Sequence, residues 1–275
     1  MEILLAAVVL FVASAPTDLV VEGHDYATSV KLDLGNHKTA WFLLHKFRRA
    51  MVNASRTKIG GLVEMDGSYV GGYQPGLKGG RQHKGRKAAV IIAAVEVRTR
   101  TWKDRDGVER TREYAGRCRV EVVRMETAAH IAEFLECNVE PGSVIRSDGL
   151  RGYGAAAREL GYTAIPRPQG KPTRERQVVP LAHRVISNLK VWINGTHHGV
   201  GRHHLQAYLD EFVFRFNRRQ NSEAAFQSLV GLGTQHPPVR RRTIVGASDL
   251  PYYYEGDEIE GDEAEDAEDA EDATA

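Results

Sequence analysis

The apolar positions of this chain follow two different periods. In the first region they recur at three- and four-residue intervals, which predicts an amphipathic helix with Ala40, Leu43, Leu44 and Phe47 on one face. From residue 61 the apolar residues instead fall in short runs bounded by polar and Gly-rich segments. These runs predict three successive strands at 61–70, 88–98 and 117–125, with a polar hairpin region around residues 104–107.

Helical and strand patterns alternate after residue 126. The pattern predicts a helix at 127–139, a strand at 142–149, a helix at 153–160, a short strand at 162–166, and two further helices at 182–192 and 201–219. Three meandering strands followed by alternating helices and strands indicate an α/β fold, in which helices pack on a mixed sheet.

Charge is distributed very unevenly over the 275 residues. All 37 Lys and Arg residues lie at or before Arg242, whereas 12 of the 36 acids lie between Glu255 and Asp272. Without that tail the chain carries 37 basic and 24 acidic residues, a net charge of +13. A body this basic favours a polyanionic partner, and nucleic acid first. The acidic tail has too few apolar residues to fold and is predicted to be disordered, either as a solubilising appendage or as a competitor for the basic surface.

The apolar run in the first 16 residues is open to two interpretations. It resembles the apolar part of a secretory signal peptide, but Glu2 precedes it and no Lys or Arg does, which favours a buried helix. The run is too short to span a bilayer. Cys118 and Cys137 show neither a disulfide framework nor a zinc-ribbon spacing. We therefore expect a cytoplasmic protein with no membrane contact.

Two aspartates stand at comparable places in the predicted fold. Asp66 and Asp148 each follow a short apolar run and each precede a glycine. Asp-Gly is ordinary turn chemistry, but two carboxylates brought together near strand ends could also hold divalent cations. His183 and Lys190 lie seven residues apart, and therefore on one face of a predicted helix.

These motifs resemble the DDE transposases of bacterial insertion sequences, in particular the ISXO-like group. "EMDGSYVGG" is similar to the first-aspartate motif of that family, and "GSVIRSDGLRGYGAAARELGY" to its second-aspartate strand and the helix after it. "NLKVWINGTHHGVGRHHLQAYLDEFVFRFNRR" is similar to the C-terminal segment, and "LDLGNHKTAWFLLHKFRRAM" to the end of a helix-turn-helix region. The resemblance covers roughly residues 1–220 and implies an RNase H-like catalytic domain.

The resemblance also implies roles for individual residues. Asp66 and Asp148 would be the first two metal ligands, His183 would stand where the family has a third acidic or amide ligand, and Lys190 would contact a DNA phosphate. Mg²⁺ or Mn²⁺ would be the cofactor, with imidazole favouring Mn²⁺. The implied reaction is DNA cleavage and strand transfer at the ends of the element. The implied partners are end and target DNA, with the protein acting as a homodimer or a higher oligomer.

Three departures from the family pattern weaken parts of this assignment. A histidine replaces the third carboxylate or amide, which leaves Asn188 as the runner-up and Glu64 and Glu211 as less favoured ligands. Gly67 follows the first aspartate where an acid is common. We expect the N-terminal zinc ribbon of the family to be absent, because no Cys pair in this sequence could build one. The alternative function is a truncated, inactive DNA-binding product of a mobile element.

The expected organisation has four segments, and several basic residues are candidates for DNA contact. Residues 1–55 would be a helical DNA-binding remnant resembling a helix-turn-helix, 60–222 the RNase H-like domain, 223–250 an extension and 251–275 the disordered tail. The candidate DNA contacts are Lys38, Lys46, Arg48, Lys84, Arg86, Lys87, Arg215, Arg218 and Arg219. The histidines at 197, 198, 203 and 204 are predicted to have structural or phosphate-contact roles.

Overall fold

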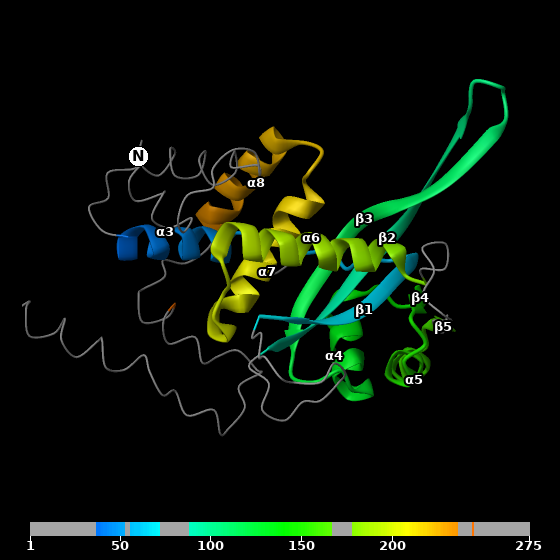
Figure 1. The fold of residues 1–275 in the computed structure, drawn as a ribbon, viewed down its shortest axis with the longest axis horizontal. Coiled ribbons are helices and arrows are strands. Elements are labelled where there is room, and N and C mark those ends of the chain that lie inside the picture. The colour runs from blue at the N-terminus through cyan, green and yellow to red at the C-terminus, as the bar shows by residue number, and fades with distance from the viewer. Residues whose placement is uncertain (1–36, 53–55, 72–87, 167–177, 236–243, 245–275) are drawn as a thin grey trace, which may run out of the picture.

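The computed structural model describes residues 37–52, 56–71, 88–166 and 178–235, together with residue 244. The described chain forms a sheet with helices packed on it (Figure 1). In chain order the elements are α3 (His37–Ala50), β1 (Leu62–Val70), β2 (Ala89–Lys103), β3 (Glu109–Val123), α4 (Ala128–Asn138), β4 (Val144–Ser147), α5 (Arg151–Glu159), β5 (Thr163–Pro166), α6 (Pro180–His197), the 3₁₀ helix η2 (Arg202–His204), α7 (Leu205–Asn217) and α8 (Ser222–Gln235).

The five strands form one mixed sheet in the order β3-β2-β1-β4-β5. The three meandering strands pair antiparallel, whereas β4 pairs parallel with both β1 and β5. Helices connect the parallel strands, as parallel pairing requires a crossover. The predicted order of strands and helices is confirmed, and the mixed sheet with flanking helices is consistent with an RNase H-like fold.

Each face of the sheet has its own apolar core. On one face Met65, Ile92 and other strand residues pack with α4 and α5, and on the other Ile91, Ala93 and Val95 pack with α6 and α7. Because side chains alternate along a strand, Glu64, Asp66 and Ser68 of β1 lie on the α6 face. The central strand therefore contributes polar groups to one face while its apolar neighbours stabilise the other.

Strands β2 and β3 are longer than the hydrophobic pattern predicts. Both run for 15 residues, although the apolar pattern ends near residue 98 in the first and begins near residue 117 in the second. The predicted turn is confirmed, because Asp104 and Val108 close it with a backbone hydrogen bond of 2.9 Å. The extra length consists of exposed polar pairs, and burial-based reasoning did not predict it.

Helix α3 packs directly on α7 and α8. Leu44 and Phe47 share an apolar cluster with Phe214 and Leu229, so the described part of the N-terminal region has a core in common with the sheet domain. This is the packing that the amphipathic pattern of α3 requires. The four proposed segment boundaries stay predictions.

Arg48 is a correction to the expected DNA contacts. The side chain, expected outside the apolar face of its helix, is completely buried, and its Nε donates to Glu211 Oε2 at 2.9 Å. Its guanidinium carbon also lies 3.9 Å from the centroid of the Tyr208 ring. Arg48 is one helical turn after Leu44, and a carboxylate on α7 makes burial of its charge possible. Lys38 and Lys46 are exposed, as expected.

Several predictions concern segments outside the described residues. These segments are the apolar run near residue 1, the loop that carries Lys84, Arg86 and Lys87, and the acidic tail. Among the residues that the structure does describe, no helix combines the length and the apolar character needed to cross a membrane.

Candidate active site

Asp66 and Asp148 are brought together by the pairing of β1 with β4. The parallel register aligns Met65 with Ser147, so the next residue along each chain is one of the two aspartates. Asp148 ends its strand and accepts a hydrogen bond of 3.0 Å from the backbone N–H of Leu150, in the turn that leads into α5. The structure thus places side by side two carboxylates that are 82 residues apart in sequence.

Helix α6 lies over these carboxylates and carries the other two predicted site residues. His183 Nε2 lies 3.1 Å from Asp66 Oδ2, and Lys190 Nζ donates to Ser68 Oγ at 2.8 Å. The seven-residue spacing places both side chains on the same face of the helix. All four residues predicted to form the site therefore lie on one face of the sheet or at its edge.

Hydrogen bonding and burial shift the pKa values of the side chains around the aspartates. The hydrogen bond that His183 donates to Asp66 raises the pKa of His183 despite partial burial, and the charges of Asp66, Glu64 and Asp148 act in the same direction. Burial raises the pKa of Tyr153 well above its usual range, with further contributions from Glu126, Asp66 and Asp148. The charges of Asp66 and Asp148 thus act on two side chains that belong to different helices, His183 on α6 and Tyr153 on α5.

The structure distinguishes His183 from Asn188 by position. His183 contacts Asp66, whereas Asn188 is exposed and lies five residues further along the helix, on a different side. His183 is therefore the third polar residue at the site, although its role as a metal ligand stays a prediction.

Glu64 and Glu211, the less favoured ligands, both have structural partners. Glu64 is completely buried and accepts hydrogen bonds from the backbone N–H groups of Leu181 and Ala182, at 2.7 and 3.0 Å. A carboxylate from β1 therefore caps the first turn of α6, a turn that has no acid of its own. Glu211 pairs with Arg48 and with Arg215, at 2.9 Å in each case.

Sequence reasoning missed the role of Glu126. Its carboxylate accepts a hydrogen bond of 2.9 Å from the hydroxyl of Tyr153 and lies against Gly67, where a Cβ would stand 2.2 Å from Glu126 Oε1. A side chain at this position would therefore displace a carboxylate that comes from the chain before α4. In the sequence, only the unusual glycine at position 67 pointed to a close contact there, and it did not show that Glu126 makes this contact.

The donor set suits a hard cation only in part. Asp66 and Asp148 supply the oxygen ligands that Mg²⁺ and Mn²⁺ prefer. Within the described residues, however, no three His, Cys, Asp or Glu side chains are grouped closely enough to hold a metal ion. The Nε2 atom of His183 is engaged with Asp66, so the arrangement is a two-carboxylate site with a histidine hydrogen-bonded to one carboxylate.

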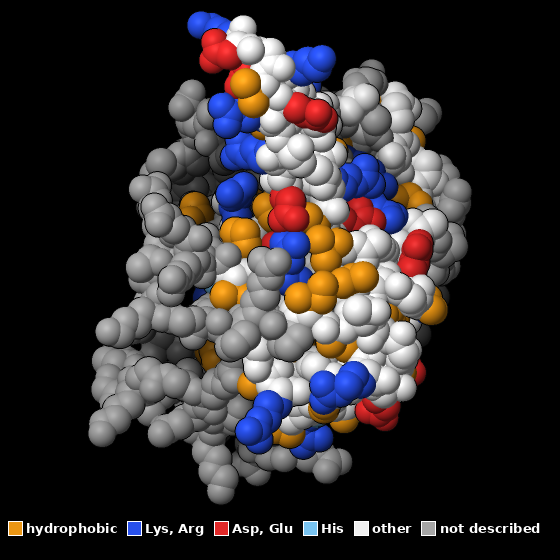
Figure 2. Space-filling model, turned by 90° about the vertical axis from the view of Figure 1, so that its right-hand side faces the viewer, with side chains coloured by type: hydrophobic (Ala, Val, Ile, Leu, Met, Phe, Trp, Pro, Cys, Tyr) orange, Lys and Arg blue, Asp and Glu red, His pale blue; other side chains and the backbone are white. Residues whose placement is uncertain are grey.

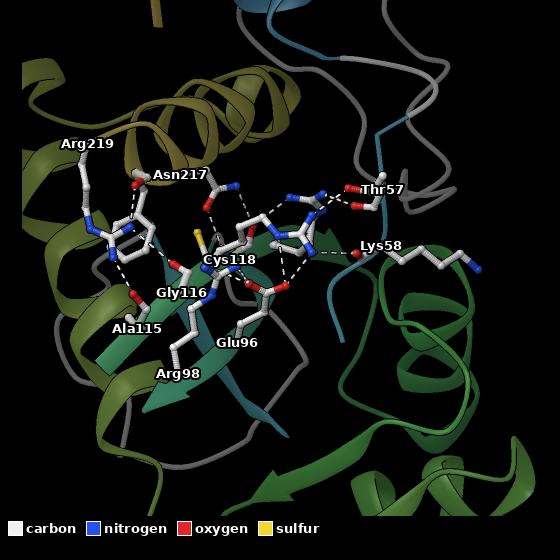
Figure 3. A network of polar contacts seen from close by, with 12 residues as sticks. Thr57, Lys58, Glu96, Arg98, Ala115, Gly116, Cys118, Asn217 and Arg219 are labelled. Carbon is white, nitrogen blue, oxygen red and sulfur yellow. Dashed lines mark hydrogen bonds and ion pairs between the residues drawn. The ribbon is translucent and has the colours of Figure 1, made fainter. Parts of the chain in front are cut away.

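The predicted DNA contacts at the end of α7 are also used inside the protein. Arg219 donates to the backbone carbonyls of Ala115 and Gly116 on β3 (Figure 3) and lies over the ring of Phe216. Arg218 lies over Phe214 in the same way. Arg215 pairs with Glu211. Arg219 thus links the end of α7 to β3, whereas these contacts of the other two arginines are to residues of α7 itself. Contact of the three arginines with DNA stays a prediction.

Two of the histidines at 197, 198, 203 and 204, namely His197 at the end of α6 and His204 in η2, belong to an aromatic cluster between helices. His197 contacts the rings of Trp192 and Tyr208, while His204 contacts Trp41 and His45. These contacts support the structural role predicted for His197 and His204.

The fold and the paired aspartates define a class first, that of RNase H-like α/β domains with acidic residues on adjoining strands. Asp66 lies within β1, not at its end as the sequence predicted, and Asp148 directly follows β4. The chain is placed more closely by its sequence: residues 58–217 match the ISXO2-like transposase domain, and the chain belongs to that family. A comparison with curated proteins finds no match. The family indicates a transposase, in general terms a DDE-type nuclease and transferase that uses divalent metal ions and binds DNA.

Proposed function

We propose that this protein cleaves DNA at the ends of an insertion sequence and transfers the strands to a target, with Asp66 and Asp148 as metal ligands. The observation that carries the proposal is the register of β1 and β4, which aligns these two carboxylates beside His183. Membership of the transposase family supports the reaction type.

Asp66 and Asp148 would hold the divalent cations. Mg²⁺ or Mn²⁺ would activate a water or a DNA 3′-hydroxyl and stabilise the leaving oxygen in an in-line displacement at phosphorus. No covalent protein nucleophile is needed. His183 would complete the ligand set, but only after its Nε2 has given up the proton shared with Asp66, because a metal ligand must be deprotonated.

Lys190 would bind a DNA phosphate next to the cut. It is half-buried on the same helix face as His183, and burial lowers its pKa while the charge of Asp66 acts in the opposite direction. Its hydrogen bond to Ser68 holds the ammonium close to the carboxylates. Together with the cations that Asp66 and Asp148 would hold, this lysine would orient a phosphate for attack.

DNA cleavage by purified variants tests the proposal. With an oligonucleotide of the element's own end and Mg²⁺ or Mn²⁺, the wild type should nick and join, whereas Asp66→Asn and Asp148→Asn should lose both activities. Glu133→Gln, at an exposed position on α4, is the control and should keep full activity. A wild type that binds end DNA but neither nicks nor joins it would instead support the alternative, an inactive DNA-binding product.

Metal binding to His183 has a readout that does not depend on activity. Titration of Mn²⁺ by calorimetry in two buffers of different ionisation enthalpy should detect proton release by the wild type near neutral pH. His183→Gln should bind Mn²⁺ more weakly and release fewer protons. Equal proton release by the two proteins would show that His183 is not a ligand.

We also propose the setting of this reaction. The partners would be end and target DNA, the active form a homodimer or a higher oligomer assembled on DNA, and the compartment the cytoplasm. The basic body of the chain supports a DNA partner, since neutralised phosphates release counterions.

A further inference from the structure

The paired strands β2 and β3 extend beyond the sheet as a projecting two-stranded ribbon (Figure 1). Residues 98–103 and 109–114 are exposed at every position. Apolar burial therefore contributes little to this part of the ribbon. The chain maintains 12 residues of regular β-structure that the core does not need, which points to a contact outside the molecule.

The two faces of the ribbon differ sharply in chemistry. The register pairs Arg98 with Tyr114, Arg100 with Arg112 and Trp102 with Arg110. Because side chains alternate, these six residues share one face, which we call the arginine face. The opposite face carries Thr99, Thr101, Lys103, Glu109, Thr111 and Glu113. All four arginines of these two segments thus lie on one face, together with both of their aromatic residues.

The charges on the arginine face are only partly balanced. Arg98 is paired with Glu96 at 3.3 Å, and Arg110 with Asp104 at 2.9 Å. Arg100 and Arg112 are exposed and directly opposite each other, and no hydrogen bond or ion pair to either is found among the described residues. Like charges directly opposite each other destabilise a strand pair. An external anion would offset that cost.

The ribbon also carries exposed aromatic rings beside its arginines, and an ion pair fixes its base to the sheet. Trp102 and Tyr114 on the arginine face are 42% and 39% exposed, so each leaves much of its ring surface in contact with solvent. On the opposite face Glu113 pairs with Arg146 of β4 at 2.9 Å, which anchors the base of the ribbon to the sheet. Figure 2 shows Lys and Arg side chains over this projecting end of the molecule.

We propose that the arginine face of the ribbon binds duplex DNA by entering the major groove. A two-stranded β-ribbon fits that groove, arginines recognise phosphates and guanine edges, and exposed rings contact bases or sugars. The inference rests on the proposed function only in taking DNA as the partner. It adds a second DNA-binding element, which is separate from the aspartates and built from residues that no metal site needs.

Two matched variants of the full-length protein test whether DNA binding depends on which face of the ribbon carries the charges or only on the number of charges. Arg100→Gln/Arg112→Gln removes two charges from the arginine face, and Lys103→Gln/Arg105→Gln removes two from elsewhere on the same ribbon. Binding to a fluorescent 30-base-pair duplex is measured by anisotropy in EDTA at several salt concentrations. EDTA prevents cleavage, so an inactive catalytic site does not affect the outcome.

The arginine-face variant should bind duplex DNA about tenfold more weakly and reduce the slope of log K against log salt by about two. The affinity of the control variant for duplex DNA should fall by about threefold or less. Emission from Trp102, one of only three tryptophans in the sequence, should change on binding in the wild type and not in Trp102→Phe.

Three results would overturn the proposal. Equal losses of DNA affinity in the two double variants would mean that affinity depends only on the total charge of the protein. Unchanged binding together with an altered oligomeric state in light scattering would assign the face to a second copy of the protein. Stronger binding to single strands than to duplex, lost in the arginine-face variant, would make the ribbon a stacking platform for unpaired bases.

Discussion

Glu64→Gln should destabilise the protein by removing one buried negative charge. Glu64 accepts hydrogen bonds from the backbone N–H groups of Leu181 and Ala182 and from Arg146 Nη1, at 2.7, 3.0 and 3.2 Å. Glutamine preserves the shape and keeps one carbonyl acceptor, but loses the charge that faces the positive end of α6.

The magnitude follows from these contacts. A hydrogen bond to a charged group contributes about 1.5–3 kcal/mol, and breaking a buried ion pair on one side costs about 3–5 kcal/mol. Arg146 keeps Glu113 as a second partner, at 2.9 Å, so the full penalty is not reached. We expect the free energy of unfolding to fall by roughly 2–4 kcal/mol.

Urea unfolding followed by circular dichroism, in EDTA, measures this loss. Glu113→Gln is the matched control, because it removes the other carboxylate of the same arginine from a side chain that is 42% exposed, and it should cost less than about 1 kcal/mol. A loss in Glu64→Gln no larger than in the control would refute the idea that Glu64 anchors α6. Because α6 carries His183, we also expect Glu64→Gln to slow cleavage more than it weakens DNA binding.

Two further changes follow from buried groups. Burial is the largest cause that lowers the pKa of His45 to about 2, and the charges of Arg48, His204 and His197 act in the same direction. Below pH 6.5 the unfolded chain therefore binds a proton at His45 that the folded protein does not bind. Stability should therefore fall by about 1.4 kcal/mol per pH unit below pH 6.5, and urea unfolding of His45→Leu should show a shallower loss. Gly67→Ala places a methyl group against Glu126 and should lower the unfolding free energy by about 1 kcal/mol, whereas Gly195→Ala, with open space around it, should raise it by roughly 0.5–1 kcal/mol. Thermal unfolding measures both, and equal changes of the same sign would contradict the packing argument.

Local patterns predicted much of the fold and part of the site. Short apolar runs bounded by polar and Gly-rich segments identified the five strands in order, because such runs are a property of neighbouring residues. The helical period placed His183 and Lys190 on one face for the same reason. The Asp-Gly pair at residue 148 marked the end of a strand, whereas the pair at residue 66 lies within β1. Neither pair could be told from an ordinary turn until the family resemblance was added.

Partners that come from distant parts of the chain were not predictable in this way. Arg48 has the charge of a surface residue, and only the approach of Glu211 on α7 allows its burial. Glu126 fills the space beside Gly67 although nothing near either residue indicates the other.

The sequence by itself determined the order of the strands and helices and which residues share a helix face. Tertiary structure decided that Asp66 and Asp148 are neighbours, that Glu64 caps α6, and that four arginines gather on one side of a ribbon. Periodicity acts over a few residues, whereas strand register and packing join segments far apart in the chain. The chemistry of this protein depends on those long-range pairings.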